Sequence, residues 1–147
     1  MPMVWQVLPD ARLLIAGSNP AEEVQELLKR YGQVTLIANP PDTVSIYAEA
    51  AVLLNPAQSG SGVNLKSVEM LESARPSVFT SQALAGFNKA IRSVLVAHDA
   101  PQAFAEMMIT YRGTPDAYPR ETVAAYLKTY FCLGPERVVQ RWLEGEV

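Results

Sequence analysis

The chain has 147 residues, of which 49% are hydrophobic and 18% charged, and its net charge is −3 at pH 7. This length suits one domain with its own hydrophobic core, and the slight acidity argues against an electrostatic hold on nucleic acid. A single cysteine, Cys132, excludes an internal disulfide. A single histidine, His98, leaves too few nitrogen and sulfur ligands for a zinc site.

The sequence also bears on location. No apolar run reaches the roughly 18 residues that a membrane-spanning helix needs. The N-terminus, MPMVWQVLPDAR, lacks the basic start and the small-residue cleavage site of an export signal. We therefore expect a soluble, cytoplasmic protein without a membrane span.

The first hundred residues alternate short apolar runs with amphipathic segments. The run RLLIAG at 12–17 predicts a strand that ends at its glycine, and a proline two residues after Ser18 can start a helix. Apolar residues then recur at helical spacing over 20–31, and Gly32 ends that helix. Similar patterns predict strands at 33–38, 51–56, 76–80 and, less clearly, 93–97, a short helical stretch through Tyr47 and Glu49, and a helix from about 63 to 74.

This alternation indicates the fold class. Continuous apolar strands between helices are typical of parallel strands that are covered on both faces. The sequence therefore predicts an α/β fold, a Rossmann-like open parallel sheet with helices on both faces. Ligands of such sheets bind beyond the carboxyl ends of the strands, here the loops at 17–20, 39–42, 57–62 and 80–88. From residue 101 the pattern is helical, with helices predicted at 102–111, 120–132 and 135–143.

The most informative stretch runs from a strand end through a glycine loop into a helix. Glycines allow the backbone to approach a ligand closely, and the first N–H groups of a helix are unpaired donors at the positive end of its dipole. The helix is expected to begin near Val63. This pattern predicts an anion site in a loop made of Ser59, Gly60, Ser61 and Gly62.

The helix that follows carries two charged residues, Lys66 and Glu69, away from its apolar stripe. A lysine in the first turn opposes the preference of the helix dipole for acids, and a bound anion would explain it. Glu69 has the chemistry to accept hydrogen bonds from sugar hydroxyls. The alternative is an ordinary solvated Lys/Glu pair behind a common glycine loop. Neither a dinucleotide fingerprint nor a P-loop motif is present.

Several motifs recur in a fixed order over roughly residues 4–110. They are PDARLLIAG at 9–17, VTLI at 34–37, YAEAA at 47–51, Pro56, the glycines Gly60 and Gly62, Lys66, Glu69, and RPSVFT at 75–80. In this order and spacing they resemble the C-terminal domain of two-domain retaining GT-B glycosyltransferases of the group 1 type.

The resemblance implies a nucleotide-diphosphate-sugar donor as substrate, of the UDP-sugar or GDP-sugar kind, whose sugar passes to an acceptor with retention. It implies donor binding by Gly17, by the loop from Ser59 to Gly62 with Val63, by Lys66 opposite the diphosphate, and by Glu69 on the ribose. It implies no cofactor and no metal, and it assigns no catalytic residue. We accordingly divide the chain into a donor-binding domain at 1–112 and a helical tail at 113–147, packed on that domain or on a partner domain.

The chain also departs from the family pattern. Many relatives have a second glutamate eight positions before the ribose-binding one, and Ser61 stands there. The family's domain normally begins with a further strand and helix, of which residues 1–8 look like only the helix end. The acceptor-binding N-terminal domain is expected as a missing partner, without which we expect no catalysis.

Two alternatives follow from these departures. One is a non-catalytic module that has kept the GT-B-like fold and binds protein. The other, which has less support, is a non-hydrolysing epimerase built on the same half-fold.

Among the remaining residues, we interpret His98 as a surface histidine, Cys132 as a buried thiol and Asn39 as a turn residue. The resemblance places Gly86 and Phe87 where the family's donor-side loop runs.

Overall fold

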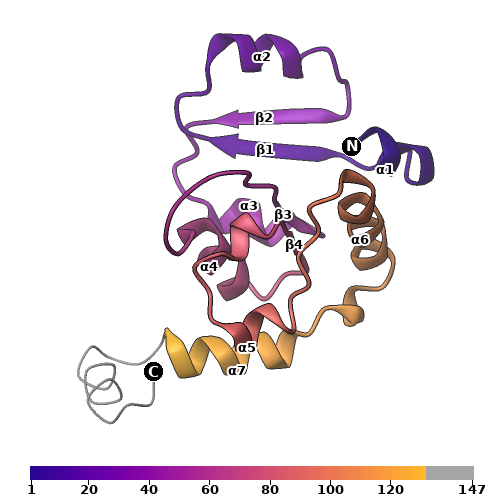
Figure 1. Ribbon diagram of the computed structural model, residues 1–147. Coiled ribbons are helices and arrows are strands. Elements are labelled where there is room, and N and C mark those ends of the chain that lie inside the picture. Colours follow the sequence, from indigo (N-terminus) through magenta and orange to yellow (C-terminus); the bar gives the residue numbers. More distant parts are fainter. Residues whose placement is uncertain (132–147) are drawn as a thin grey trace.

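The computed structural model describes residues 1–131, and its elements follow the predicted alternation (Figure 1). The strands are β1 (Leu13–Gly17), β2 (Val34–Ala38), β3 (Leu53–Asn55) and β4 (Ser77–Phe79). The α-helices are α1 (Pro2–Val7), α2 (Glu22–Leu28), α3 (Val44–Glu49), α4 (Leu65–Glu72), α5 (Lys89–Arg92), α6 (Pro101–Gly113) and α7 (Arg120–Tyr130). Two 3-10 turns complete them, η1 (Gln82–Leu84) and η2 (Pro115–Ala117). Cys132 and the helix predicted at 135–143 lie outside the described residues.

The strands pair in parallel, β1 with β2 and β3 with β4. The α/β class with parallel strands is therefore confirmed. In the described residues, however, the hydrogen-bonded ladders are two, with two strands each, and β1 is not bonded to β3. In Figure 1, β1 lies between β2 and the part of the molecule that holds β3 and β4. The open sheet is thus interrupted between β1 and β3.

The fifth predicted strand, at 93–97, is wrong. The amides of Val94 and Leu95 both donate to the carbonyl of Ile91, at 3.0 and 2.9 Å, and so close the end of α5. Amides used in this way are not free to form a ladder. A single backbone bond, from the amide of His98 to the carbonyl of Phe79 at 2.9 Å, brings the following residues alongside the end of β4.

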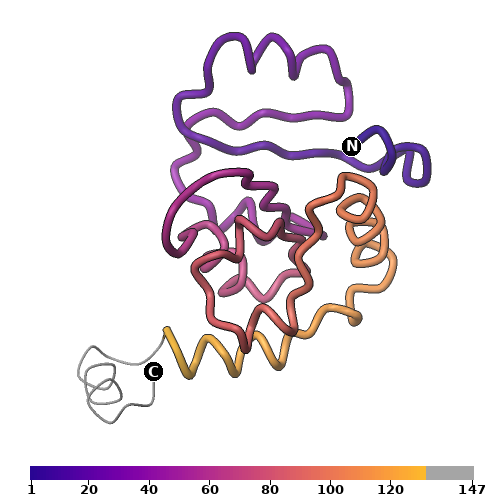
Figure 2. Tube along the Cα trace, viewed as in Figure 1, coloured from indigo at the N-terminus to yellow at the C-terminus, as the bar shows by residue number. Residues whose placement is uncertain are grey.

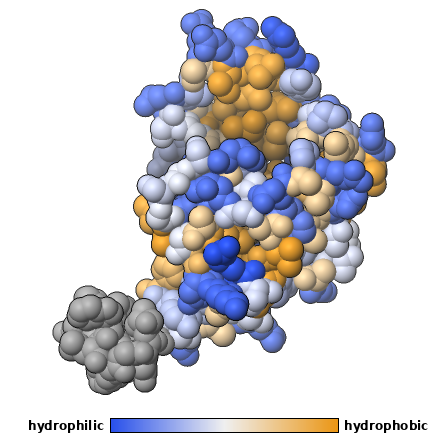
Figure 3. Space-filling model, in the orientation of Figure 1, coloured by the Kyte–Doolittle hydropathy of each residue, from blue (hydrophilic) through white to orange (hydrophobic). Residues whose placement is uncertain are grey.

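The hydrophobic core surrounds β3 and β4. The largest buried side chains come from these strands and the helices on them, including Phe79, Leu71, Leu84, Ile91 and Val123. By contrast, every residue of β1 is only half-buried, although all are apolar or glycine. Figure 3 shows a broad hydrophobic area over the region that β1, β2 and α2 occupy in Figure 1. The β1–β2 unit is therefore incompletely covered.

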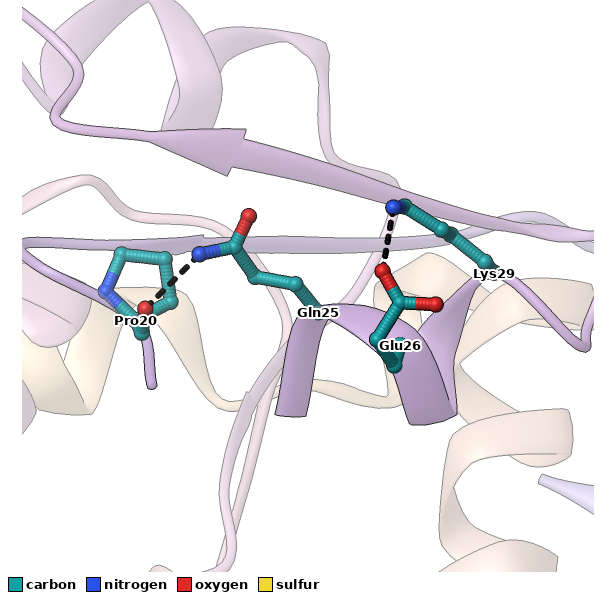
Figure 4. Close-up of polar contacts among 4 residues, drawn as sticks. All are labelled: Pro20, Gln25, Glu26 and Lys29. Atoms are coloured by element: carbon teal, nitrogen blue, oxygen red, sulfur yellow. Dashed lines mark hydrogen bonds and ion pairs between the residues drawn. The ribbon is translucent and has the colours of Figure 1, made fainter. Parts of the chain in front are cut away.

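Helix α2 illustrates this incomplete cover. It has no buried residue, and Val24 and Leu27 are 44% and 49% exposed. Figure 4 shows its polar contacts, a hydrogen bond from Nε2 of Gln25 to the carbonyl of Pro20 and an ion pair between Glu26 and Lys29. Because the ion pair is largely exposed, it contributes little to stability. The helix ends at Leu28, earlier than the residue 31 predicted.

The two ends of the described chain reach different parts of the molecule. Figure 2 shows the N-terminal segment beside the orange trace of α6, and α1 contacts that helix. Trp5 of α1 donates its indole N–H to the carbonyl of Ala11 at 2.9 Å and stacks on Tyr31. At the other end, α7 packs against α4 and places Val123 and Leu127 in the core. The domain division at residue 112 stays a prediction.

Candidate functional site

The loop between β3 and α4 contains both glycines of the predicted anion site. Gly60 has φ +142° and Gly62 has φ +73°, backbone conformations that side chains with a Cβ rarely adopt. The helix begins at Leu65, two residues later than predicted. Its N-cap is Asn64, whose side-chain oxygen accepts a hydrogen bond from the amide of Ser67 at 3.3 Å.

The cap leaves most amides of this segment unused. Within the described residues, no amide from Gln58 to Lys66 donates a hydrogen bond. Backbone N–H groups are strong donors that folded proteins normally satisfy with a protein group, water or a ligand. The hydroxyls of Ser59 and Ser61, both exposed, likewise have no partner in this part of the chain. The loop therefore presents a row of free donors to solvent.

Lys66 and Glu69 are both exposed, but they do not pair with each other. The side chain of Lys66 has no hydrogen bond or ion pair to any described residue. Glu69 instead accepts a hydrogen bond from the hydroxyl of Tyr47 on α3, at 3.0 Å. Burial, together with the hydrogen bond and charge of Glu69, raises the pKa of Tyr47 to about 12. The solvated Lys/Glu pair considered above does not form, and the ammonium of Lys66 stays available to an anion.

A buried polar network holds the two ends of the loop. Nδ2 of Asn55, at the end of β3, donates to Oγ of Ser67 at 2.9 Å. The Ser67 hydroxyl in turn donates to the carbonyl of Ala83 in η1 at 2.7 Å. Ser67 is fully buried and Asn55 is 7% exposed. Sequence reasoning missed this network, whose one signal was a polar Asn within an otherwise apolar strand.

The loop after β4 packs directly on the glycine loop. Nε2 of Gln82 donates to the carbonyl of Gly60 at 2.9 Å. A Cβ added to Gly86 would lie 2.5 Å from both N and Cα of Val63 and 2.6 Å from the carbonyl carbon of Gly62. The backbone of Gly86 therefore touches the glycine loop, where the sequence placed it only near the donor side.

Gly17 occupies a separate place at the end of β1. Its carbonyl accepts a hydrogen bond from the amide of Asn39 at 2.9 Å, and the Asn39 side chain accepts one from the amide of Asn19 at 2.9 Å. Asn39 has φ +52° and acts as a turn residue. No hydrogen bond in the described chain joins Gly17 to the glycine loop. The structure thus brings together Gly60, Gly62, Val63, Lys66 and Glu69, but does not link Gly17 to them.

Two polar residues that follow the stretch at 93–97, His98 and Asp99, have structural partners. Asp99 accepts hydrogen bonds from the hydroxyl and the amide of Ser81, at 2.6 and 2.8 Å, and these hold the pKa of its carboxyl below the ordinary value. His98 is held through its backbone at the end of β4. Across residues 1–131, no three His, Cys, Asp or Glu side chains are grouped so as to hold a metal ion. The same residues contain no helix of the length and apolarity that crossing a membrane requires.

Comparison with known proteins decides the family. The family model of the group 1 glycosyl transferases matches residues 1–112, about three quarters of the chain. The chain belongs to this family. No curated protein and no solved structure matched it. Membership indicates glycosyl transfer in general, and the matched region contains the glycine loop, α4 and Gly86.

Proposed function

We propose that this chain provides the donor-binding part of a group 1 glycosyltransferase and holds the diphosphate of a nucleotide-sugar on the glycine loop. The observation that carries the proposal is the row of free amides from Gln58 to Lys66, which ends at the unpaired ammonium of Lys66. A diphosphate offers several strong acceptor oxygens and negative charge, and both suit backbone N–H groups at a helix N-terminus.

The same groups suit the chemistry of sugar transfer. When the bond from the sugar to the diphosphate breaks, negative charge grows on the departing phosphate. Preorganised amide donors and a lysine stabilise such charge without reorganisation, so that a metal ion has no part in the proposal. Glu69, oriented by Tyr47 at 3.0 Å, has a second carboxylate oxygen with which to accept a hydrogen bond from a ribose hydroxyl.

Titration calorimetry tests donor binding. We expect UDP or GDP to bind the chain, and Lys66→Ala to weaken that binding by about tenfold or more, because a hydrogen bond to a charged group contributes about 1.5–3 kcal/mol. Lys29→Ala is the matched control, since Lys29 lies just after α2 and pairs with Glu26. The proposal is refuted if no nucleoside diphosphate binds the chain. If Lys66→Ala and the wild type bind UDP or GDP with equal affinity, the diphosphate does not bind at Lys66.

We further propose that, in the whole enzyme, the additional first strand that the family's donor-binding domain normally has lies between β1 and β3. In the parallel ladder, Leu13 donates to Gln33 and Asn39 donates to Gly17, so the alternate residues Leu14 and Ala16 direct their N–H and C=O groups away from β2. In β3, Leu53 and Asn55 bond toward β4 and Leu54 points away from it. A strand order in which the first strand stands between the second and fourth is usual in doubly wound folds.

Amide hydrogen exchange tests this strand. In the chain alone, the amides of Leu14 and Ala16 should exchange much faster than that of Ile15, which lies in the ladder with β2. In a polypeptide that also carries the family's first strand, the amides of Leu14, Ala16 and Leu54 should become protected. Unchanged rapid exchange there would contradict the proposed strand.

A second function is favoured by one observation, the exposed apolar side chains of α2, such as Val24 and Leu27, on the helix that packs on β2. Exposed apolar patches often mark protein interfaces. A non-catalytic module that binds protein through this face would keep the fold and would be indifferent to nucleotides. The calorimetric titration separates the two functions, because only the donor-binding enzyme part responds to UDP or GDP.

A further inference from the structure

A cavity apart from the glycine loop is lined by Ser81 and by residues of α5 and its flanks. It has a volume of about 520 Å³, and two buried leucines, Leu84 and Leu95, contribute to its wall. Its other lining residues are Ser81, Lys89, Arg92, Ser93 and Ala97. In Figure 3, strongly hydrophilic atoms lie directly beside hydrophobic ones over the region that α5 occupies in Figure 1. The cavity therefore combines apolar walls with a charged rim.

The charge of this rim is uncompensated. Lys89 and Arg92 are both exposed, and their side chains have no hydrogen bond or ion pair to any described residue. They stand three positions apart on one short helix, an arrangement in which like charges repel. The carboxylate beside the cavity, Asp99, uses its two oxygens on Ser81. Two neighbouring cations without a counter-charge favour an anionic ligand.

The hydroxyls of the two serines in the cavity, Ser81 and Ser93, are already used as hydrogen-bond donors. The Ser81 hydroxyl donates to Asp99, and the Ser93 hydroxyl donates to the carbonyl of Ala90 at 2.8 Å. Neither hydroxyl proton is free, so the side-chain donors of the cavity are the guanidinium of Arg92 and the ammonium of Lys89. Arginine binds phosphate oxygens in a bidentate manner and lysine adds a point charge. A phosphate monoester carries about −1.5 to −2 charge near pH 7, which matches the two cations.

We propose that this cavity binds a phosphate monoester with an apolar organic group, the phosphate between Lys89 and Arg92 and the organic group against Leu84 and Leu95. The site shares no side chain with the donor site, and it stands or falls independently of donor binding. One link to the glycine loop is Gln82, which follows Ser81 in the chain and donates a hydrogen bond to the carbonyl of Gly60.

Phenyl phosphate is a suitable probe, read by amide chemical shifts of the full chain in an NMR titration. We expect saturable shifts at Ser93, Leu95 and Ala97, and binding at least tenfold weaker in the double variant Lys89→Ala/Arg92→Ala. Inorganic phosphate should bind more weakly than phenyl phosphate, and phenol should not bind, because each lacks one half of the ligand. Arg92→Lys, which keeps the charge and loses the bidentate geometry, should bind with intermediate affinity.

The matched control is Lys29→Ala/Arg30→Ala, which removes the same charge from two exposed positions just after α2. It should bind phenyl phosphate like the wild type, and so should Lys66→Ala. The proposal is overturned if phenyl phosphate shifts none of the cavity amides, if the double variant at Lys89 and Arg92 binds unchanged, or if Lys66→Ala abolishes the binding. If Lys66→Ala loses UDP binding but still binds phenyl phosphate, the result supports two separate sites.

Discussion

Replacing Gly86 with alanine adds only a methyl group, and this addition should disturb the glycine loop. A Cβ there would meet N and Cα of Val63 at 2.5 Å, whereas ordinary contacts begin at 3.4 Å. Gly86→Ala therefore requires the two backbones to separate by about 0.9 Å, the difference between these distances. The atoms in the way belong to the backbone and have no flexible end to rotate aside. Overpacking of this kind costs about 1–3 kcal/mol.

For a domain of this size, that cost corresponds to a melting temperature lower by roughly 3–10 °C in circular dichroism. Because the displaced residues include Gly62 and Val63, UDP or GDP should also bind Gly86→Ala more weakly in calorimetry. Gly113→Ala is the control, since nothing lies within 4 Å of the added Cβ there. If Gly86→Ala matched Gly113→Ala in both melting temperature and affinity, the close packing of the two loops would be refuted.

Two further predictions concern the groups that support the site. Ser67→Ala leaves the side-chain amide of Asn55 and the backbone carbonyl of Ala83 buried without their partner. The substitution should therefore lower the free energy of unfolding in urea by about 1–3 kcal/mol. Exposed Ser18→Ala should have no effect, and an unchanged urea midpoint for Ser67→Ala would contradict the network. Tyr47 ionises near pH 10 when unfolded and at about 12 when folded, so the stability it contributes is present below pH 10 and is lost as the pH rises toward 12. Tyr47→Phe should therefore lose less stability than the wild type between pH 9 and 11.5 in urea titrations, and equal losses would count against the Tyr47–Glu69 contact.

Much of the fold was predictable because it depends on local pattern. Four apolar runs gave four strands, and each strand begins and ends within two residues of the predicted bounds. The run at 93–97 has similar composition, but its first amides end α5, and a tertiary choice of this kind has no local signature. Nor does the sequence reveal that β1 and β3 are unpaired, because ladder formation depends on what lies between them.

The candidate site likewise has a part that the sequence predicts and a part that it does not. The glycine loop and Lys66 were predictable, since both depend on a few adjacent residues and on the physics of a helix N-terminus. Contacts between distant residues were not. Tyr47 meets Glu69 across 22 positions, and Gln82 meets Gly60 across the same number. Such pairs follow from how β3, α4 and η1 pack, which no spacing in the sequence expresses.

Chemical-shift mapping of bound nucleoside diphosphate tests the central claim most directly. In a titration with UDP or GDP, we expect the largest shifts at the amides from Gln58 to Lys66, with the shifts reduced or lost in Lys66→Ala. Shifts confined to other surfaces, or none at saturating nucleotide, would contradict a donor site on the glycine loop.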